Sequence, residues 1–396
     1  MEKYSLNDFS QGKAFISNEK GTYCINVKGE KLFELSPDIK CTTYTEEDIA
    51  IVEKNGEYAV IDNHGNFLTS FAYSSINEVS HVVERKGFYG CIDITTGLSI
   101  LPCWYEEGIF CFEDGYATVK SHGKYGAVDI RKNIILPFEY DNLLYAGHNL
   151  FTALKDNKYG IINYKKRRMC KFKYDDLFPI NSDDCLLIAV IMGKYGLIDC
   201  NGNEIVHIEY EDAKPFARTN EFVAFGTGEK YGIYSISRRD FITEITYEDV
   251  CYCDDGNYFI VKKDGQTSFI DACGEQKDFP VFYPDDYRRE CTLHNTFFEG
   301  VRPVSDGKYV GVINRQGELV IPYQYKSIRF SNEGLMAVVD KNNREGYIDR
   351  KGRTIISFGK YHECRDFHCG VARVKTHEDE EVYIDKTGEI IKLNLN

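Results

Sequence analysis

A tandem repeat of about 36 residues runs through the chain and constrains its fold more than any other feature. With the Asp of the segment LIDCNG as reference, equivalent positions occur eleven times, at Asn26, Asp62, Asp93, Asp129, Asn163, Asp199, Ser235, Asp271, Asn314, Asp349 and Asp385. A period of this length is typical of solenoids, propellers and other arrays of stacked supersecondary units. The sequence therefore predicts one repeat array over residues 1–396, with degenerate capping repeats at about 1–40 and 365–396.

Each copy contains three β-rich segments separated by turn residues. The first is a short apolar run such as AIVEK, the second carries a Tyr-Gly pair, and the third ends in Tyr, usually followed by an acid. Gly stands three residues after the reference position in seven copies, Gly317 among them, where a short hairpin loop requires positive φ. Helical periodicity is absent, so we expect an all-β protein of three-stranded antiparallel meanders, without long helices in 40–360.

Prolines mark the position of the third strand in its sheet. They share one slot three residues before the final Tyr, at Pro102, Pro137, Pro280 and Pro322. Because proline cannot donate to a β-ladder, the third strand should lie at a sheet edge. One meander cannot bury its apolar face alone, so neighbouring copies must stack on one another.

Two arrangements of the stacked copies are possible. Propellers typically close with 4–8 blades, and eleven copies exceed that range. The first and last copies depart most from the pattern, as capping repeats do. We therefore expect an open curved solenoid or superhelix, with a β-propeller-like ring as the alternative.

The repeated motifs carry a resemblance to a known family. The segments GKYGAVD, GKYGLID, LPFEYDNL, IPYQY, YEDAKPFA and FSNEGLMAV resemble the WG-repeat family of bacterial proteins, over roughly residues 10 to 395. Tyr stands where that family usually has Trp, and the single tryptophan, Trp104, lies elsewhere in its copy. The resemblance implies a non-catalytic repeat protein that mediates interactions, and it brings no catalytic residue with it.

Composition excludes several functional classes. The net charge of −14 argues against a nucleic-acid partner, because such a field repels a polyanion. No window holds 18 consecutive apolar residues, so no membrane-spanning segment is expected. The start, MEKYSLNDFSQGKAF, lacks the basic and apolar regions of a secretory signal. The sequence thus predicts a cytoplasmic protein.

Metal, cofactor and catalytic sites are not expected. The 14 cysteines are scattered without a CxxC pair, as free thiols in a reducing cytosol would be. The reference Asp residues fit side-chain bonds to their own turns better than a calcium ladder. His362, Glu363 and Cys364 are consecutive, and side chains of consecutive strand residues face opposite ways, so they should not converge. We expect no enzyme activity, no metal and no cofactor.

Basic turns are the best candidate binding surface on this acidic protein. Copies four and five lack the turn Gly and carry positive charge instead, at Arg131, Lys132, Lys165, Lys166, Arg167 and Arg168. Successive copies should place equivalent turns side by side, which would gather these residues into one patch. The leading hypothesis is a scaffold that binds another macromolecule, most readily a protein.

The signature tyrosines support an alternative function. Rows of aromatic rings can stack on sugars, which would make the protein a carbohydrate- or cell-wall-binding module. A Tyr that recurs at one place in each copy is, however, first of all a packing residue. Exposure of the rings of Tyr125, Tyr159, Tyr195 and Tyr231 separates the two interpretations.

Overall fold

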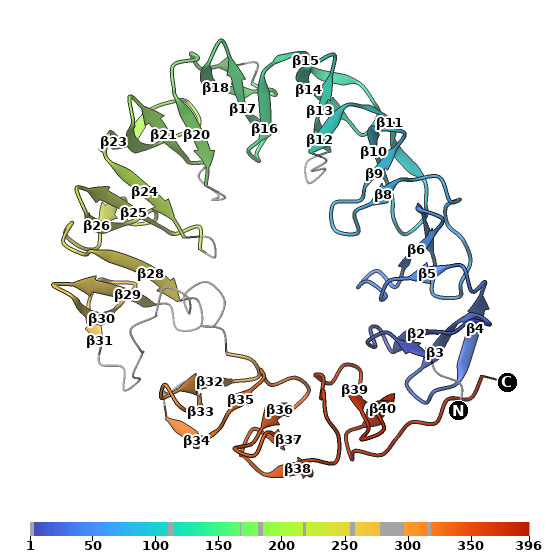
Figure 1. Cartoon of the computed structure of the whole chain (residues 1–396). Coiled ribbons are helices and arrows are strands. Elements are labelled where there is room, and N and C mark those ends of the chain that lie inside the picture. Colours follow the sequence, from blue (N-terminus) through green and yellow to red (C-terminus); the bar gives the residue numbers. More distant parts are fainter. Residues whose placement is uncertain are drawn as a thin grey trace. The chain divides into compact units, whose positions relative to one another are not determined.

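The computed structural model divides into two compact units. It describes residues 4–109, 115–166, 168–180, 185–216, 219–253, 258–277, 297–314 and 318–395. Unit 1 comprises Met1–Val79, Asp93–Leu98 and Pro280–Asn396, and unit 2 comprises Ser80–Ile92 and Ser99–Phe279. Every regular element in these described ranges is a β-strand, which confirms the all-β prediction (Figure 1).

Unit 2 consists of small antiparallel sheets that follow one another in sequence order (Figure 1). Their strands are β9 (Val82–Arg85), β10 (Phe88–Ile92), β11 (Ser99–Tyr105), β12 (Glu107–Ile109), β13 (Tyr116–Ser121), β14 (Lys124–Asp129), β15 (Ile134–Tyr140), β16 (Asn142–Tyr145), β17 (Leu150–Lys155), β18 (Lys158–Asn163), β19 (Arg168–Met169), β20 (Asp176–Pro179), β21 (Leu187–Ile191), β22 (Lys194–Ile198), β23 (Glu204–Tyr210), β24 (Asp212–Pro215), β25 (Phe222–Thr227), β26 (Lys230–Ser235), β27 (Asp240–Phe241), β28 (Asp249–Cys253), β29 (Tyr258–Lys263), β30 (Gln266–Asp271) and β31 (Gln276–Lys277).

Unit 1 contains sheets of the same kind from both ends of the sequence. Its strands are β1 (Ser5–Leu6), β2 (Lys13–Ser17), β3 (Thr22–Asn26), β4 (Lys31–Leu35), β5 (Lys40–Cys41), β6 (Ala50–Lys54), β7 (Glu57–Ile61), β8 (Ser75–Ile76), β32 (Val301–Ser305), β33 (Val310–Asn314), β34 (Leu319–Tyr325), β35 (Ser327–Ile328), β36 (Leu335–Val339), β37 (Glu345–Asp349), β38 (Thr354–Ile356), β39 (Val371–Lys375) and β40 (Glu381–Asp385).

A fourth short strand extends the predicted meander in most sheets. In the sheet ordered β16-β17-β18-β19, the last three strands are the predicted ones, and β16 comes from the connection that follows Tyr140. Its residues pair antiparallel with β17, from Asn142 opposite Leu154 to Tyr145 opposite Phe151. The expectation of three-stranded units is therefore corrected to four strands, because a strand of four residues is too short to show a periodicity in the sequence.

The turns have the conformations that the sequence predicts. Met192 and Gly193, which join β21 to β22, both have positive φ, of 52° and 72°, as a two-residue hairpin loop requires. After the second strand, Gly202 has φ of 83°, and Asp199 accepts the N–H groups of Asn201 and Asn203 at 2.8 and 2.9 Å. The reference Asp thus holds its own turn, as predicted. Gly317 lies outside the described residues.

The third strand lies at a sheet edge. Pro102, Pro137 and Pro322 fall in β11, β15 and β34, which are edge strands, and Pro280 lies outside the described residues. The Gly of the Tyr-Gly pair lets the third strand pass close to the second. A Cβ at Gly196 would be only 2.7 Å from the carbonyl oxygen of Val206. The Gly of the repeat is thus required by backbone contact.

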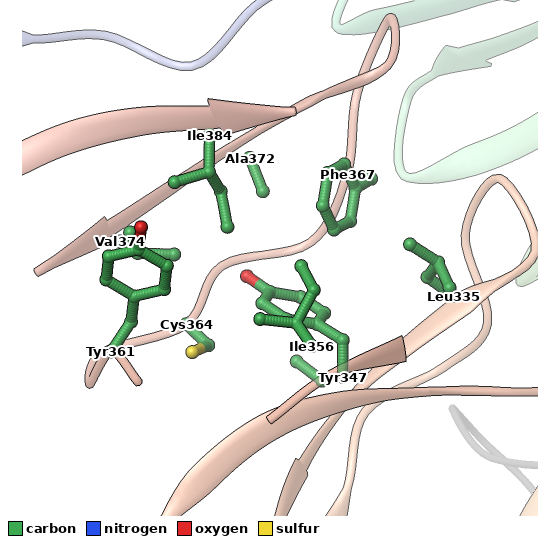
Figure 2. Close-up of a cluster of buried hydrophobic side chains, with 10 residues drawn as sticks. Leu335, Tyr347, Ile356, Tyr361, Cys364, Phe367, Ala372, Val374 and Ile384 are labelled. Atoms are coloured by element: carbon green, nitrogen blue, oxygen red, sulfur yellow. The ribbon is translucent and has the colours of Figure 1, made fainter. Parts of the chain in front are cut away.

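Hydrophobic clusters join neighbouring sheets. The cluster in Figure 2 combines Tyr347 and Ile356 of β37 and β38 with Ile384 of β40 and the connecting residue Phe367. The rings of Tyr347 and Phe367 meet edge to face, with centroids 5.0 Å apart. Each core is therefore shared by two successive repeats, which is why a single copy cannot fold alone.

In unit 1 the first and last sheets pack against each other. The rings of Phe9 and Tyr383 have centroids 4.9 Å apart, in a cluster with Leu6 and Val371. Asn394 accepts the N–H of Lys31 at 3.0 Å and donates its own N–H to Gly29 at 2.8 Å. An open solenoid lacks such a contact and is not confirmed, whereas the ring-like alternative requires it. The two terminal sheets, predicted as caps, cover one another's apolar faces.

Candidate functional site

The signature tyrosines are packing residues. The rings of Tyr125, Tyr159, Tyr195 and Tyr231 are all half-buried, and each contributes to a hydrophobic cluster of unit 2. Each also stands opposite the Tyr that ends the third segment of its own copy, as Tyr195 does with Tyr210. These rings support the core interpretation over an exposed ladder for sugars.

Charged side chains contact two of these rings, those of Tyr125 and Tyr231. The ammonium of Lys214 lies 3.7 Å from the ring centroid of Tyr231, whose hydroxyl donates to Asp212 at 2.6 Å. Burial, together with a hydrogen bond to Glu107, raises the pKa of Tyr125 to about 12. The Tyr125 phenol therefore stays protonated at neutral pH and is not an activated nucleophile.

The acid that follows the third segment links successive repeats of unit 2. Glu211 accepts the N–H of Gly228, in the first turn of the next copy, at 2.6 Å, and the ammonium of Lys194, in its own copy, lies at 3.4 Å. Asp175 does the same with Met192 and Lys158. The hydrogen bond from Lys158, followed by the N–H of Met192, holds the pKa of Asp175 below its usual value. The Lys-Tyr-Gly and Tyr-acid motifs thus join one copy to the next.

Unit 1 makes its links at a different turn. Glu299 accepts the Ser331 hydroxyl at 2.5 Å and the N–H of Gly334 in the next copy at 2.8 Å. Glu333 in turn accepts the N–H of Gly370 at 2.8 Å. In the last copy Cys369 occupies the equivalent position, and its Sγ lies 3.2 Å from the N–H of Gly12. The last copy is therefore linked to the first at the same turn at which Glu333 is linked to Gly370 of the next copy.

The predicted basic turns are exposed in unit 2. Arg131 and Lys132 lie in the turn between β14 and β15, and Lys165 and Lys166 lie in the turn between β18 and β19. No carboxylate of the described residues forms an ion pair with any of these four side chains. Arg168 begins β19, and Arg167 lies outside the described residues.

Equivalent turns of consecutive copies lie next to each other in this unit. Arg238, in the turn between β26 and β27, donates to Cys273 Sγ in the corresponding turn of the next copy at 3.0 Å. Cys170, just after β19, likewise lies 3.2 Å from the carbonyl oxygen of Asn201. The two predicted basic turns occupy consecutive positions of this same row. Their joint role in binding stays a prediction.

A further set of basic residues lies on a pocket in unit 1. The turn between β37 and β38 carries Arg350, Lys351 and Arg353, and these line a pocket of about 430 Å³ beside Glu299. The signal was present in the sequence as DRKGR. These basic residues did not stand out because their copy keeps the turn Gly, Gly352. The predicted basic turns were recognised because they lack this Gly.

The structure places Glu363 and Cys364, two of the consecutive residues noted in the sequence, in different surroundings. Burial raises the pKa of the Cys364 thiol to about 12, so it is not a thiolate at neutral pH. The adjacent Glu363 pairs with Lys375 at 2.7 Å. No group of three or more His, Cys, Asp or Glu in the described part of the protein is arranged to hold a metal ion. Within the same residues, no helix is long and apolar enough to cross a membrane.

The fold and the links between copies define a protein built from tandem β-sheet repeats. The chain belongs to the WG-repeat family: the family described as WG containing repeat matches residues 89–125, 125–159, 195–231, 311–344 and 346–378. The matches fall in both units and follow the copies identified in the sequence. None of the curated proteins matches the sequence.

Several solved structures match most of this chain at low sequence identity. A eukaryotic initiation factor is 9% identical, with a TM-score of 0.40 over 96% of this chain and 100% of that chain. The tricorn protease is 11% identical, with a TM-score of 0.26 over 99% of this chain and 48% of that one. PorZ, a surface component of the type-IX secretion system of Porphyromonas gingivalis, is 10% identical, with a TM-score of 0.25 over 98% of this chain and 58% of PorZ.

Proposed function

We propose that the protein is a non-catalytic, cytoplasmic scaffold that binds an acidic protein partner through the basic turns of copies four and five, in unit 2. One observation carries the proposal: Arg131, Lys132, Lys165 and Lys166 are exposed in equivalent turns of consecutive copies and have no ion pair with a described carboxylate. Unpaired cations gain most from an incoming carboxylate, because no internal partner has to be displaced. The protein as a whole has a net charge of −14, so these positively charged turns favour a partner with an acidic surface.

Carbohydrate binding is the weaker candidate. It requires open aromatic faces, whereas the signature tyrosines are half-buried and Lys214 covers the ring of Tyr231. Nothing in the arrangement of these rings favours sugar stacking over packing.

Charge reversal tests the proposal. We expect the double variant Lys165→Glu/Lys166→Glu to fold normally, since exposed turn residues contribute little to stability. Proteins captured by the wild type from its native lysate at low salt should include acidic ones that this variant loses and that salt releases.

The matched control is Arg238→Glu/Arg239→Glu, which reverses two charges in an equivalent turn further along the row. This control should keep the captured proteins. If both double variants retain the same proteins as the wild type, or lose the same ones, the basic turns of copies four and five are not the binding surface.

A further inference from the structure

The pocket in unit 1 has walls of unequal chemical character. It is bounded by the turn Glu299-Gly300 before β32, by Gly334 before β36, and by the turn 349–353 between β37 and β38. All of these segments belong to unit 1, and together they bring two carboxylates and three cations to one pocket of about 430 Å³.

Both carboxylates already have their hydrogen-bond partners. Glu299 accepts from the Ser331 hydroxyl and from the N–H of Gly334. Asp349 accepts the N–H groups of Lys351 and Arg353, both at 2.9 Å, and the Arg353 Nε at 2.6 Å. The acceptors of the pocket are therefore occupied within the protein, and they do not favour a cationic ligand.

The cations, in contrast, keep donors free. Arg350 uses one terminal nitrogen to bind the carbonyl oxygen of Glu299 at 2.7 Å, which fixes the guanidinium at the pocket. Arg353 spends only its Nε on Asp349. The Lys351 ammonium has no ion pair with a described carboxylate. A guanidinium has five N–H donors and an ammonium three, so most donors of this pocket are available to a ligand.

We propose that this pocket binds a carboxylate of a partner polypeptide, as a site separate from the basic turns of unit 2. Three cations and two carboxylates leave a net charge of +1, which matches one carboxylate. A phosphate dianion would meet stronger repulsion from Glu299 and Asp349. The planar guanidinium of Arg350 suits a carboxylate, which it can bind through two parallel hydrogen bonds. Asp and Glu residues and the free C-terminus of a polypeptide offer the same group.

Short peptides and nuclear magnetic resonance of the full-length protein test the proposal. The probes are an acetylated and amidated tetra-aspartate, an acetylated tetra-alanine with a free C-terminal carboxylate, its amidated neutral analogue, and inorganic phosphate. The readout is the amide signals of Gly300 and Gly334, which lie on the pocket in unit 1. The first two probes separate side-chain from C-terminal carboxylates.

We expect at least one carboxylate peptide to shift these signals saturably, and the neutral peptide to leave them unchanged. Lys351→Ala and Arg350→Met should each weaken the binding about tenfold, the value of one charged hydrogen bond. Two matched controls should bind as the wild type does. Lys28→Ala alters the same turn position in the first copy, and Arg344→Met removes an Arg that pairs with Asp340 as Arg353 pairs with Asp349.

Three results would overturn the proposal. The first is that neither carboxylate peptide shifts the signals of Gly300 and Gly334. The second is that phosphate binds and the carboxylates do not. The third is that the control variants weaken binding as much as Lys351→Ala does.

Discussion

In both units a carboxylate links one repeat to the next, but this carboxylate stands at different positions of the repeat in the two units. In unit 2 the acid after the third strand, such as Asp175 or Glu211, receives a turn N–H of the next copy and a Lys of its own. In unit 1 that position holds Lys326 or His362, and the link has moved to Glu299 and Glu333, in the turn before the first strand. In both units a carboxylate of one copy accepts a turn N–H of the next copy. The position of that carboxylate within the repeat is not fixed.

The difference lies in the burial of the partners. Ser331, which donates to Glu299, is only 3% exposed, whereas the Lys partners of Asp175 and Glu211 are on the surface. A buried donor depends on its acceptor far more than an exposed one, because water cannot replace the lost bond. Loss of a link should therefore cost unit 1 more than unit 2.

The cores should behave alike even though the links differ. Phe151 in unit 2 and Phe367 in unit 1 are both essentially inaccessible to solvent. Replacement of either by Ala should lower the free energy of unfolding by about 3–5 kcal/mol, measured by chemical denaturation. If one of the two variants is as stable as the wild type, the two units do not share a common core design.

Removal of the buried link should have the next largest effect. Glu299→Ala leaves the Ser331 hydroxyl and the Gly334 N–H without an acceptor, and should destabilise by about 1–3 kcal/mol. The control is Glu378→Ala, because the carboxylate of Glu378 binds no described residue of the protein. Equal melting temperatures of these two variants would contradict a structural role for the Glu299 link.

Removal of an exposed link should cost less. Asp175→Ala loses the Met192 N–H and the Lys158 ammonium, both at the surface, where water takes over. Its melting temperature should fall by less than that of Glu299→Ala, and the difference from the control Glu229→Ala should shrink at high salt. A larger loss than in Glu299→Ala would reverse the comparison between the units.

Acid should weaken the Glu299 link. Burial by itself would raise the pKa of Glu299, but the hydrogen bonds from Ser331 and Gly334 and the charges of Arg350 and Lys386 outweigh it and lower that pKa. A carboxylate with a lowered folded-state pKa stabilises above its unfolded value of about 4.3 and loses this contribution as the pH falls through the folded value. Between pH 7 and pH 3, unfolding free energy should thus fall less in Glu299→Gln than in the wild type. Identical pH profiles would contradict this.

Most of the fold could be predicted because the repeat carries its own signals. Each of its signals has a local physical cause: the Gly of the turn, the Pro of the edge strand, and the Asp that accepts hydrogen bonds from its own turn. The structure shows them at Gly202, Pro137 and Asp199. The fourth strand could not be predicted, since β16 has four residues and depends on its pairing with β17.

The contacts between different copies could not be predicted from the sequence. Phe9 and Tyr383 are far apart in the sequence, and no local pattern indicates that their rings meet. The pocket near Arg350 likewise depends on Glu299, which belongs to the preceding copy. The basic turns were visible because their charge departs from the repeat, whereas the turn of Arg350 and Lys351 keeps its Gly and did not stand out.

Hydrogen exchange at Lys31 tests most directly the claim that the first copy follows the last as any copy follows its predecessor. The N–H of Lys31 is bound by the carbonyl oxygen of Asn394, so it should be protected in the full-length protein. A truncated protein that ends at residue 392 should lose this protection, while the N–H of Cys24, inside the sheet of β2 and β3, keeps its own. The same slow exchange at Lys31 in both proteins, or fast exchange in both, would contradict the account.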